Sequence, residues 1–357
     1  MKQIIIFLLT AASLMSAQPI KSKQIVDLRG TWKFEIGDSK QWSDPKFNDS
    51  KWNDIFVPAD WENEGFPGYD GYAWYRNRFK LPQNVQDKEL FFHLIVDDVC
   101  AVYINGNLIG EGGQFPPHYG TAYNVHHEFF IPAKYLRYNQ ENIVAVRVYD
   151  DHLYGGIVSG KVGVFTHETE MELAVKIPEV WKLNEGDYRE WKEPNFNDSE
   201  WEDVIVPAKW DFQGHRNFDG IAWYRVSFDV PSNFKEGDYV MMLGKIDDFD
   251  ETYLNGVLIG TTGIIRSNGR MRRSDTEYKL YRGYSIPNGV LKVGQKNVIA
   301  VRVYDQMSWG GIYEGPIGIV KERDFKHWES KYEINQDYNI GGRNDFERFI
   351  DKFFKEN

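Results

Sequence analysis

The sequence predicts an all-β protein made of two tandem β-sandwich domains of the jelly-roll kind, followed by a short C-terminal helix. The first observation is an internal duplication. Ala73-Trp74-Tyr75-Arg76 recurs as Ala222-Trp223-Tyr224-Arg225, and Phe47-Asn48-Asp49-Ser50 recurs as Phe196-Asn197-Asp198-Ser199, both at an offset of 149 residues. A repeat of this length is a whole domain rather than one unit of a solenoid. The second observation is the local pattern of short strand-like runs separated by Gly and Pro turns, which is typical of sandwiches.

The N-terminal segment, residues 1–17, has the pattern of a secretory signal peptide. Lys2 supplies the positive charge, residues 4–9 form an apolar run, and Ser16-Ala17 is a small-residue cleavage site. The apolar run is too short to span a membrane. We therefore expect an exported protein, periplasmic or extracellular, without a membrane span. The net charge of −11 argues against nucleic acid as a partner, because phosphate binding needs clustered Lys and Arg.

Each copy is expected to form one sandwich, module 1 over residues 25–166 and module 2 over 172–320. Asn105-Gly106 and Asn255-Gly256 stand between strand-like runs and predict two-residue hairpins. Cys100 is the single cysteine and is expected to be a small buried residue, so no internal disulfide is possible.

The tail, residues 321–357, is expected to carry an amphipathic helix. Its aromatic and aliphatic residues at 346, 349, 350, 353 and 354 follow the helical spacing. The helix would lie as a strap on the sandwich or, alternatively, dock on a partner.

Several motifs resemble the N-terminal sugar-binding domain of glycoside hydrolase family 2, a galactose-binding-like jelly roll. These motifs are Leu28-Arg29-Gly30-Thr31-Trp32, Gly71-Tyr72-Ala73-Trp74-Tyr75-Arg76 and Asn105-Gly106. Module 2 is also similar to the jelly-roll segment of bacterial sialate O-acetylesterases at Asp247-Asp248-Phe249-Asp250-Glu251. The resemblance covers roughly residues 25–320 and implies carbohydrate binding.

The enzymes of both families carry their chemistry in another domain, a (β/α)₈ barrel or an α/β hydrolase. The two modules leave no alternating strand–helix pattern to build one. Gly37-Asp38-Ser39 copies the nucleophile motif of such esterases, but we interpret this as coincidence because the second copy reads Gly186-Asp187-Tyr188. No catalytic residues and no cofactor are predicted.

The tryptophans are the first candidates for a binding site. Trp61 and Trp210 lie in Gly-rich polar segments, where an exposed ring could stack on a sugar. Conservation of both in the duplication equally suits a structural role. Trp223, like Trp74, lies in a strand-like run, where core packing is the favoured interpretation.

Charged residues of module 2 are the second set of candidates. Arg225 with a carboxylate such as Asp248 could hold sugar hydroxyls, or could form an internal ion pair. Arg302 allows both interpretations. Asp248 and Asp250 have the spacing of a glycosidase acid/base pair, which we consider the weaker hypothesis. Module 2 is preferred because Asp250-Glu251-Thr252 stands where module 1 has Cys100-Ala101-Val102.

Two loops differ most between the copies. The histidines within residues 111–128 match no zinc spacing, so no metal site is expected. The arginines within residues 261–283 could bind an anionic glycan, or could simply be solvated. The residues proposed to bind carbohydrate are Trp61, Trp210, Asp219, Trp223, Arg225, Asp248, Glu251, Arg302 and Trp309.

The sequence thus predicts a secreted, non-catalytic carbohydrate-binding protein whose ligand is a glycan or polysaccharide, neutral or anionic. One alternative is an ancillary subunit that docks on a separate glycoside hydrolase or carbohydrate esterase. Another is a glycosidase or esterase with an unrecognised site.

Overall fold

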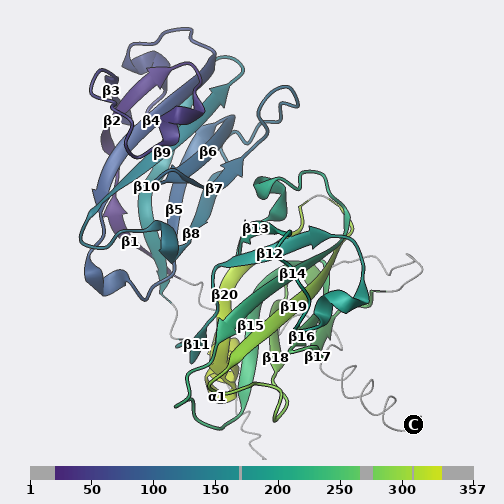
Figure 1. Ribbon diagram of the computed structural model, residues 1–357. Coiled ribbons are helices and arrows are strands. Elements are labelled where there is room, and N and C mark those ends of the chain that lie inside the picture. Colours follow the sequence, from purple (N-terminus) through teal and green to yellow (C-terminus); the bar gives the residue numbers. More distant parts are fainter. Residues whose placement is uncertain (1–20, 169–170, 266–275, 308, 332–357) are drawn as a thin grey trace, which may run out of the picture.

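The computed structural model describes residues 21–168, 171–265, 276–307 and 309–331, which form two β-sandwiches (Figure 1). The prediction of an all-β fold with two sandwiches is confirmed. The expected signal peptide and the expected helix around residues 346–354 lie outside the described residues. No helix of the described residues is long and apolar enough to cross a membrane.

Module 1 packs a four-stranded sheet, in the order β1-β10-β5-β8, against a six-stranded sheet in the order β3-β2-β4-β9-β6-β7. Its strands are β1 (Lys21–Asp27), β2 (Gly30–Ile36), β3 (Asn53–Val57), β4 (Gly71–Lys80), β5 (Leu90–Asp97), β6 (Val99–Ile104), β7 (Asn107–Gly112), β8 (His126–Ile131), β9 (Glu141–Asp150) and β10 (Gly156–Glu168).

Module 2 repeats both sheets, in the orders β11-β20-β15-β18 and β13-β12-β14-β19-β16-β17. The topology is therefore duplicated together with the sequence. Its strands are β11 (Val175–Lys176), β12 (Val180–Glu185), β13 (Glu202–Ile205), β14 (Gly220–Asp229), β15 (Tyr239–Asp247), β16 (Phe249–Leu254), β17 (Val257–Thr262), β18 (Tyr281–Ser285), β19 (Lys296–Asp305) and β20 (Gly311–Lys321).

Both faces of the six-stranded sheets are covered. On β4, Tyr75 points into the core between the sheets, whereas Trp74 points to the outer face. There it packs edge-on against Trp42, with the ring centroids 6.2 Å apart, and both lie beside Trp52. The expected core packing of the strand tryptophans is thus confirmed, as a second aromatic layer outside the sandwich.

The two predicted hairpins are present. Asn105 and Gly106 have φ angles of 50° and 86°, and Asn255 and Gly256 have 52° and 83°. Positive φ at both positions is what a two-residue turn with the twist of a hairpin requires, and Asn-Gly supplies it at low cost.

The helix α1 (Glu322–Lys331) was not predicted. Its buried residues Phe325 and Trp328 pack against Met171, Val240 and Met242, on the outer side of the four-stranded sheet of module 2. This face is therefore covered by the segment that directly follows β20.

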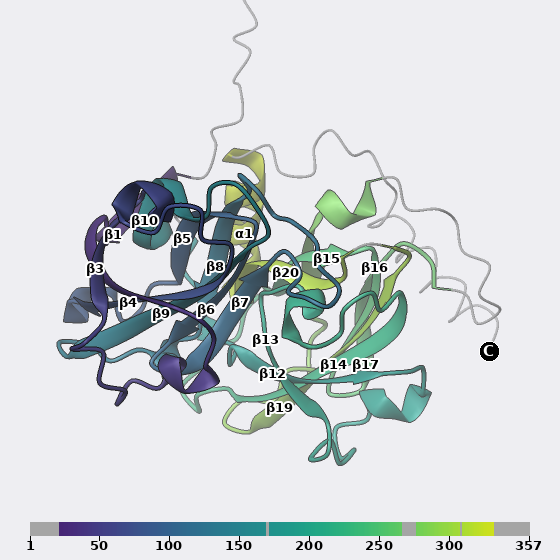
Figure 2. The same cartoon turned by 90° about the horizontal axis from the view of Figure 1, so that it is seen from above.

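The modules contact each other along their sides (Figure 2). Ile205 of module 2 packs on Phe91 and Phe130 of module 1. The backbone N–H of Ala133 donates to Glu179 Oε2 at 2.6 Å. A pocket of about 690 Å³ lies between the modules, lined in part by residues 86–89 and 171–173.

Candidate functional site

The indole rings of Trp61 and Trp210 are fully buried, so the prediction that they stack on a ligand is wrong. Each begins a short 3-10 helix, η2 (Trp61–Glu64) or η6 (Trp210–Gln213), and points inward. A glycine backbone covers each ring: a Cβ atom on Gly155 would lie 2.3 Å from Trp61, and one on Gly310 would lie 2.2 Å from Trp210. A glycine from a segment distant in the sequence thus closes over each ring.

Trp223 is also fully buried and cannot contact a ligand. It lies on the outer face of β14, between Trp191 and the stacked ring of Tyr253, whose centroid is 5.7 Å away. The alternative of core packing is the correct one.

Arg225 forms an internal ion pair. Its Nε donates to Asp198 Oδ2 at 2.8 Å, and its guanidinium also donates to the backbone oxygen of Trp191. Arg76 and Asp49 form the same contact in module 1 at 2.9 Å. Of the two interpretations of Arg225, the structure shows the internal ion pair, with Asp198 as the partner. The repeated Phe-Asn-Asp-Ser motif is therefore explained by its aspartate, which neutralises a buried arginine.

Arg302 and Glu251 belong to a second ion-pair network. Arg302 has no exposed side-chain surface and binds Asp187 through two hydrogen bonds of 2.7 and 2.5 Å. Glu251 accepts from Arg302 at 3.3 Å and from Arg189 at 2.5 Å. Because Arg302 is buried and paired, the prediction that it binds carbohydrate is wrong. Glu251 keeps 15% of its side chain exposed.

The motif Gly37-Asp38-Ser39 has the same structural role in module 1 that Asp187 has in module 2. Asp38 accepts from Arg147 Nε at 2.7 Å and from Trp74 Nε1 at 3.0 Å. Its carboxylate corresponds to that of Asp187 in module 2. This gives a physical reason for the motif that does not involve a nucleophilic serine.

Asp250 is completely buried and has three polar partners. Its carboxylate accepts from Arg282 Nε at 3.0 Å, Tyr284 Oη at 2.9 Å and Thr252 Oγ1 at 2.9 Å. It therefore cannot form an accessible acid/base pair with Asp248. Arg282, expected in a solvated basic loop, is instead buried, while the loop arginines at 266, 270, 272 and 273 lie outside the described residues.

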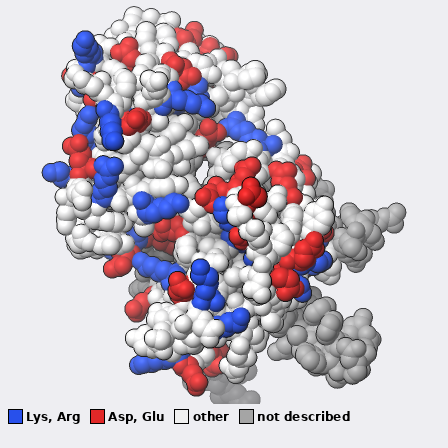
Figure 3. All heavy atoms as spheres, in the orientation of Figure 1, with Lys and Arg blue, Asp and Glu red and all other residues white. Residues whose placement is uncertain are grey.

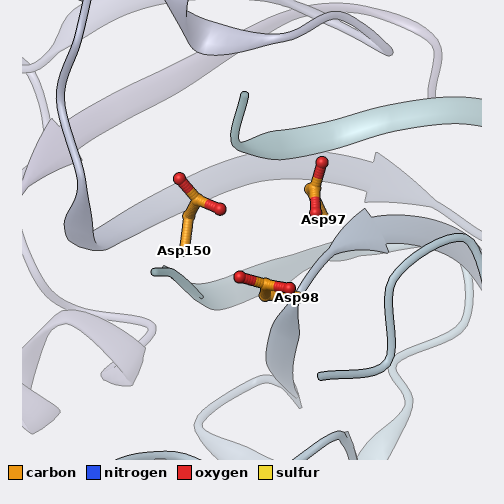
Figure 4. Close-up of side chains that lie close together, drawn as sticks. All are labelled: Asp97, Asp98 and Asp150. Atoms are coloured by element: carbon orange, nitrogen blue, oxygen red, sulfur yellow. The ribbon is translucent and has the colours of Figure 1, made fainter. Parts of the chain in front are cut away.

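Three aspartates converge at the corresponding end of each module. The Asp150 cluster consists of Asp97, Asp98 and Asp150 (Figure 4), and the Asp305 cluster consists of Asp247, Asp248 and Asp305. In each cluster one carboxylate oxygen per residue lies within 4.8 Å of the others.

Strand register brings these carboxylates together. Val99 of β6 pairs with Tyr149 of β9, so the residues just before and just after them, Asp98 and Asp150, become neighbours. Phe249 and Tyr304 do the same in module 2. Asp150 and Asp305 were not among the residues predicted to form a site. The available signal was that Asp-Asp and Val-Tyr-Asp are present in both copies.

The clusters are electrostatically unfavourable when fully ionised. Burial and the neighbouring aspartates raise the pKa of Asp150 to about 8 and that of Asp97 to about 6. For the same reasons, the pKa of Asp247 rises to about 8 and that of Asp305 to about 7. A cation, a proton or a donor group would stabilise either cluster.

Unlike the other tryptophans predicted to bind carbohydrate, Trp309 lies at the surface with an accessible ring. About 49% of it is exposed, and the ammonium nitrogen of Lys209 lies 3.5 Å from its ring centroid. Phe212 is also adjacent, with the ring centroids 5.7 Å apart. The loop is held by Gly310, whose N–H donates to Asp211 Oδ2 at 2.9 Å.

Lys209 links this ring electrostatically to the Asp305 cluster. The negative charge of Asp247 raises the pKa of Lys209, although burial has the larger effect and lowers it to about 8. Asp219 is exposed, and its charge and that of Asp248 raise the pKa of Asp305. We call Trp309, Lys209, Phe212, Asp219 and the Asp305 cluster the Trp309 site. Of the predicted residues it contains, Asp219 and Trp309 are exposed, whereas Asp248 is buried and accepts from the N–H of Gln306.

The charge pattern of the surface does not by itself identify a ligand. On the face shown in Figure 3, acidic and basic side chains are interspersed over both modules. The Trp309 site combines an exposed aromatic ring with the exposed carboxylate of Asp219, a hydrogen-bond acceptor. Such a combination can hold the apolar face and the hydroxyl groups of a sugar.

The duplicated sandwiches and their motifs resemble the β-domains of glycoside hydrolase family 2. The family described as the β-galactosidase second all-beta domain matches residues 37–152 and 186–308, which is more than half of the chain. The chain belongs to this family, with one copy of the domain in each module.

Similar proteins are much longer than the matched region. A β-glucuronidase of Formosa agariphila is 32% identical over 136 residues, which cover 34% of this chain and 13% of that protein. The β-galactosidase BoGH2A of Bacteroides ovatus is 28% identical over 150 residues, 37% of this chain and 16% of that protein. The crystal structure of a Bacteroides uniformis β-glucuronidase superposes with a TM-score of 0.36 at 18% identity, over 80% of this chain and 28% of that chain.

Proposed function

We propose that this protein is a non-catalytic carbohydrate-binding protein that acts in polysaccharide recognition or degradation, and that it is exported. The observation that carries the proposal is the half-exposed ring of Trp309, which lies against the ammonium of Lys209. The membership of the chain in a β-galactosidase domain family supports a carbohydrate ligand.

The charges of the Trp309 site favour a neutral sugar. The charges of Asp219 and Asp248, which raise the pKa of Asp305, outnumber the single ammonium of Lys209. A uronate or a sulfated glycan would be repelled, whereas sugar hydroxyls can donate to the carboxylates.

The test compares two exposed aromatic residues of module 2. In Trp309→Ala the affinity for a neutral glycan, measured by isothermal titration against a polysaccharide panel, is expected to fall about tenfold or more, as for other aromatic anchors. Tyr188→Ala is the control, because Tyr188 is 57% exposed and packs on Trp191, outside the Trp309 site. Equal affinities of Trp309→Ala and the unmodified protein would refute the assignment of the site.

A second candidate function is that of an ancillary subunit on a separate glycoside hydrolase. It is favoured by the relatives, which are named as glycosidases and in which the matched region is only 13% and 16% of the length. Co-elution of this protein with a purified family 2 glycosidase of the same organism in size-exclusion chromatography would support it. Separate elution at micromolar concentrations would reject it.

A further inference from the structure

The Asp150 cluster contains a buried carboxylate that has no hydrogen-bond donor. Asp150 is completely buried, and neither of its carboxylate oxygens accepts from a donor of the described residues; its side-chain neighbour is the carboxylate of Asp98, to which only a protonated Asp150 could donate. A buried ionised carboxylate without a donor is strongly unfavourable, so a positively charged partner or a proton is required there. In Figure 4 this carboxylate faces those of Asp97 and Asp98.

The neighbouring groups add negative charge. Asp98 accepts from Thr121 Oγ1 at 2.6 Å and from the N–H of Asp151 at 2.9 Å, which fixes its orientation. Glu62 Oε1 is buried without a hydrogen-bond partner among the described residues. The charges of Asp60 and Glu62 contribute to the raised pKa of Asp97.

Module 2 has a lysine at the corresponding sequence position. The residue that corresponds to Asp60 by the repeat offset is Lys209, and its ammonium interacts electrostatically with Asp247. Asp305 also has one partner that Asp150 lacks, because its Oδ1 accepts from the N–H of Met307 at 3.2 Å. The Asp305 cluster is therefore partly neutralised by the chain itself.

We propose that the Asp150 cluster binds one hard divalent cation, calcium, and that Lys209 takes the place of this cation in module 2. All the candidate ligands are carboxylate oxygens, which calcium and magnesium prefer, whereas zinc is usually bound by nitrogen or sulfur. Three carboxylates of fixed position suit the flexible coordination of calcium better than the strict octahedron of magnesium.

Calorimetric titration of the full chain with calcium chloride after chelation tests the proposal. One ion per chain is expected to bind, with a dissociation constant of about 1 mM or tighter, in the range of extracellular modules. Asp150→Asn is expected to abolish the binding, whereas Asp305→Asn, the same change in the other module, is expected to keep it.

A second variant separates loss of the site from loss of folding. Asp60→Lys introduces at the Asp150 cluster the ammonium that module 2 has, so it is expected to abolish calcium binding and the calcium-induced increase in melting temperature. Circular dichroism reports whether either variant is folded. No calcium binding by the unmodified chain, or equal binding by a folded Asp150→Asn or Asp60→Lys variant, would overturn the proposal. Because the Trp309 site lies in module 2, glycan binding by the Asp60→Lys variant tests the proposed function separately.

Discussion

At the scale of single residues, buried arginines connect distant turns to the central strands. Arg76 and Arg225 are buried at corresponding positions of β4 and β14, and each binds the aspartate of its Phe-Asn-Asp-Ser motif. The two aspartates differ in their surroundings. The side chain of Asp49 is 6% exposed and also binds Arg78, whereas that of Asp198 is 31% exposed.

This difference predicts unequal costs of the same substitution. Asp49→Ala leaves the buried guanidinium of Arg76 without its carboxylate and is expected to lower the free energy of unfolding by about 3 kcal/mol or more. Asp198→Ala should cost less, because water can reach the vacated place and partly solvate Arg225. Urea unfolding of both variants measures the difference, and a smaller cost for Asp49→Ala would contradict the argument.

Single residues also show where sequence reasoning failed. The sequence placed Trp61 in a Gly-rich polar segment, which suggested exposure. Its burial depends on Gly155, whose backbone covers the ring although it is distant in the sequence. Such a contact is visible only after the strands between the two residues have been placed. By contrast, Trp74 could be assigned to the core because its own strand-like run determines its environment.

At the scale of elements, the sequence was most informative where structure is local. The Asn-Gly hairpins depend on four consecutive residues, and both were predicted correctly. The convergence of Asp98 with Asp150 depends on the register between β6 and β9. A register shift of one residue would move every side chain of the shifted strand to the opposite face of the sheet. For this reason the Asp150 cluster was not found, although all its residues were visible as repeated motifs.

The pairing of β1 with β10 depends on one glycine. Gly163 pairs with Asp27, and a Cβ atom at Gly163 would lie 2.1 Å from the backbone oxygen of Val26. Gly163→Ala is therefore expected to separate β1 from β10 and to destabilise module 1 by about 2–3 kcal/mol. Gly30→Ala is the matched control, because Gly30 also has a positive φ, of +134°, but has no atom within 4 Å of a Cβ.

Thermal unfolding of these two variants separates steric conflict from backbone preference. Gly30→Ala should cost only about 1 kcal/mol, the penalty of a side chain in that conformation. If both variants melt at the same temperature, the close approach of Val26 to Gly163 does not limit stability.

At the scale of the whole molecule, the side-by-side contact of the modules was not predictable from either copy alone. The contact uses residues that differ between the copies, such as Ile205, where module 1 has Phe56 at the equivalent repeat position. Ile205 is buried against Phe91 and Phe130, whereas Phe56 is 52% exposed. The same repeat position is therefore buried in the contact between the modules in module 2 and exposed to solvent in module 1.

Glu89 makes the stability of this contact dependent on pH. It lines the pocket between the modules together with Thr166, Pro207 and Ile317. Burial raises its pKa from 4.5 to about 7, while His167 and Lys176 lower it and Glu179 raises it. Between pH 4.5 and about 7 the folded protein therefore retains a proton that the unfolded chain has released. The contribution of Glu89 to stability is complete below pH 4.5 and is lost as the pH rises to about 7.

Glu89→Gln removes this loss, because a neutral amide needs no proton to remain buried. The variant and the unmodified protein are expected to have similar free energies of unfolding near pH 4.5. At pH 8 the variant should be more stable by up to about 3 kcal/mol, the free energy that corresponds to the shift in pKa. Urea unfolding across this pH range measures the difference. Asp87→Asn, a change at an exposed side chain of the same loop, is the control and should leave the pH dependence of the free energy of unfolding unaltered. Parallel curves for Glu89→Gln and the unmodified protein would show that the Glu89 carboxylate is solvated in the folded state, and that the contact between the modules does not respond to its ionisation.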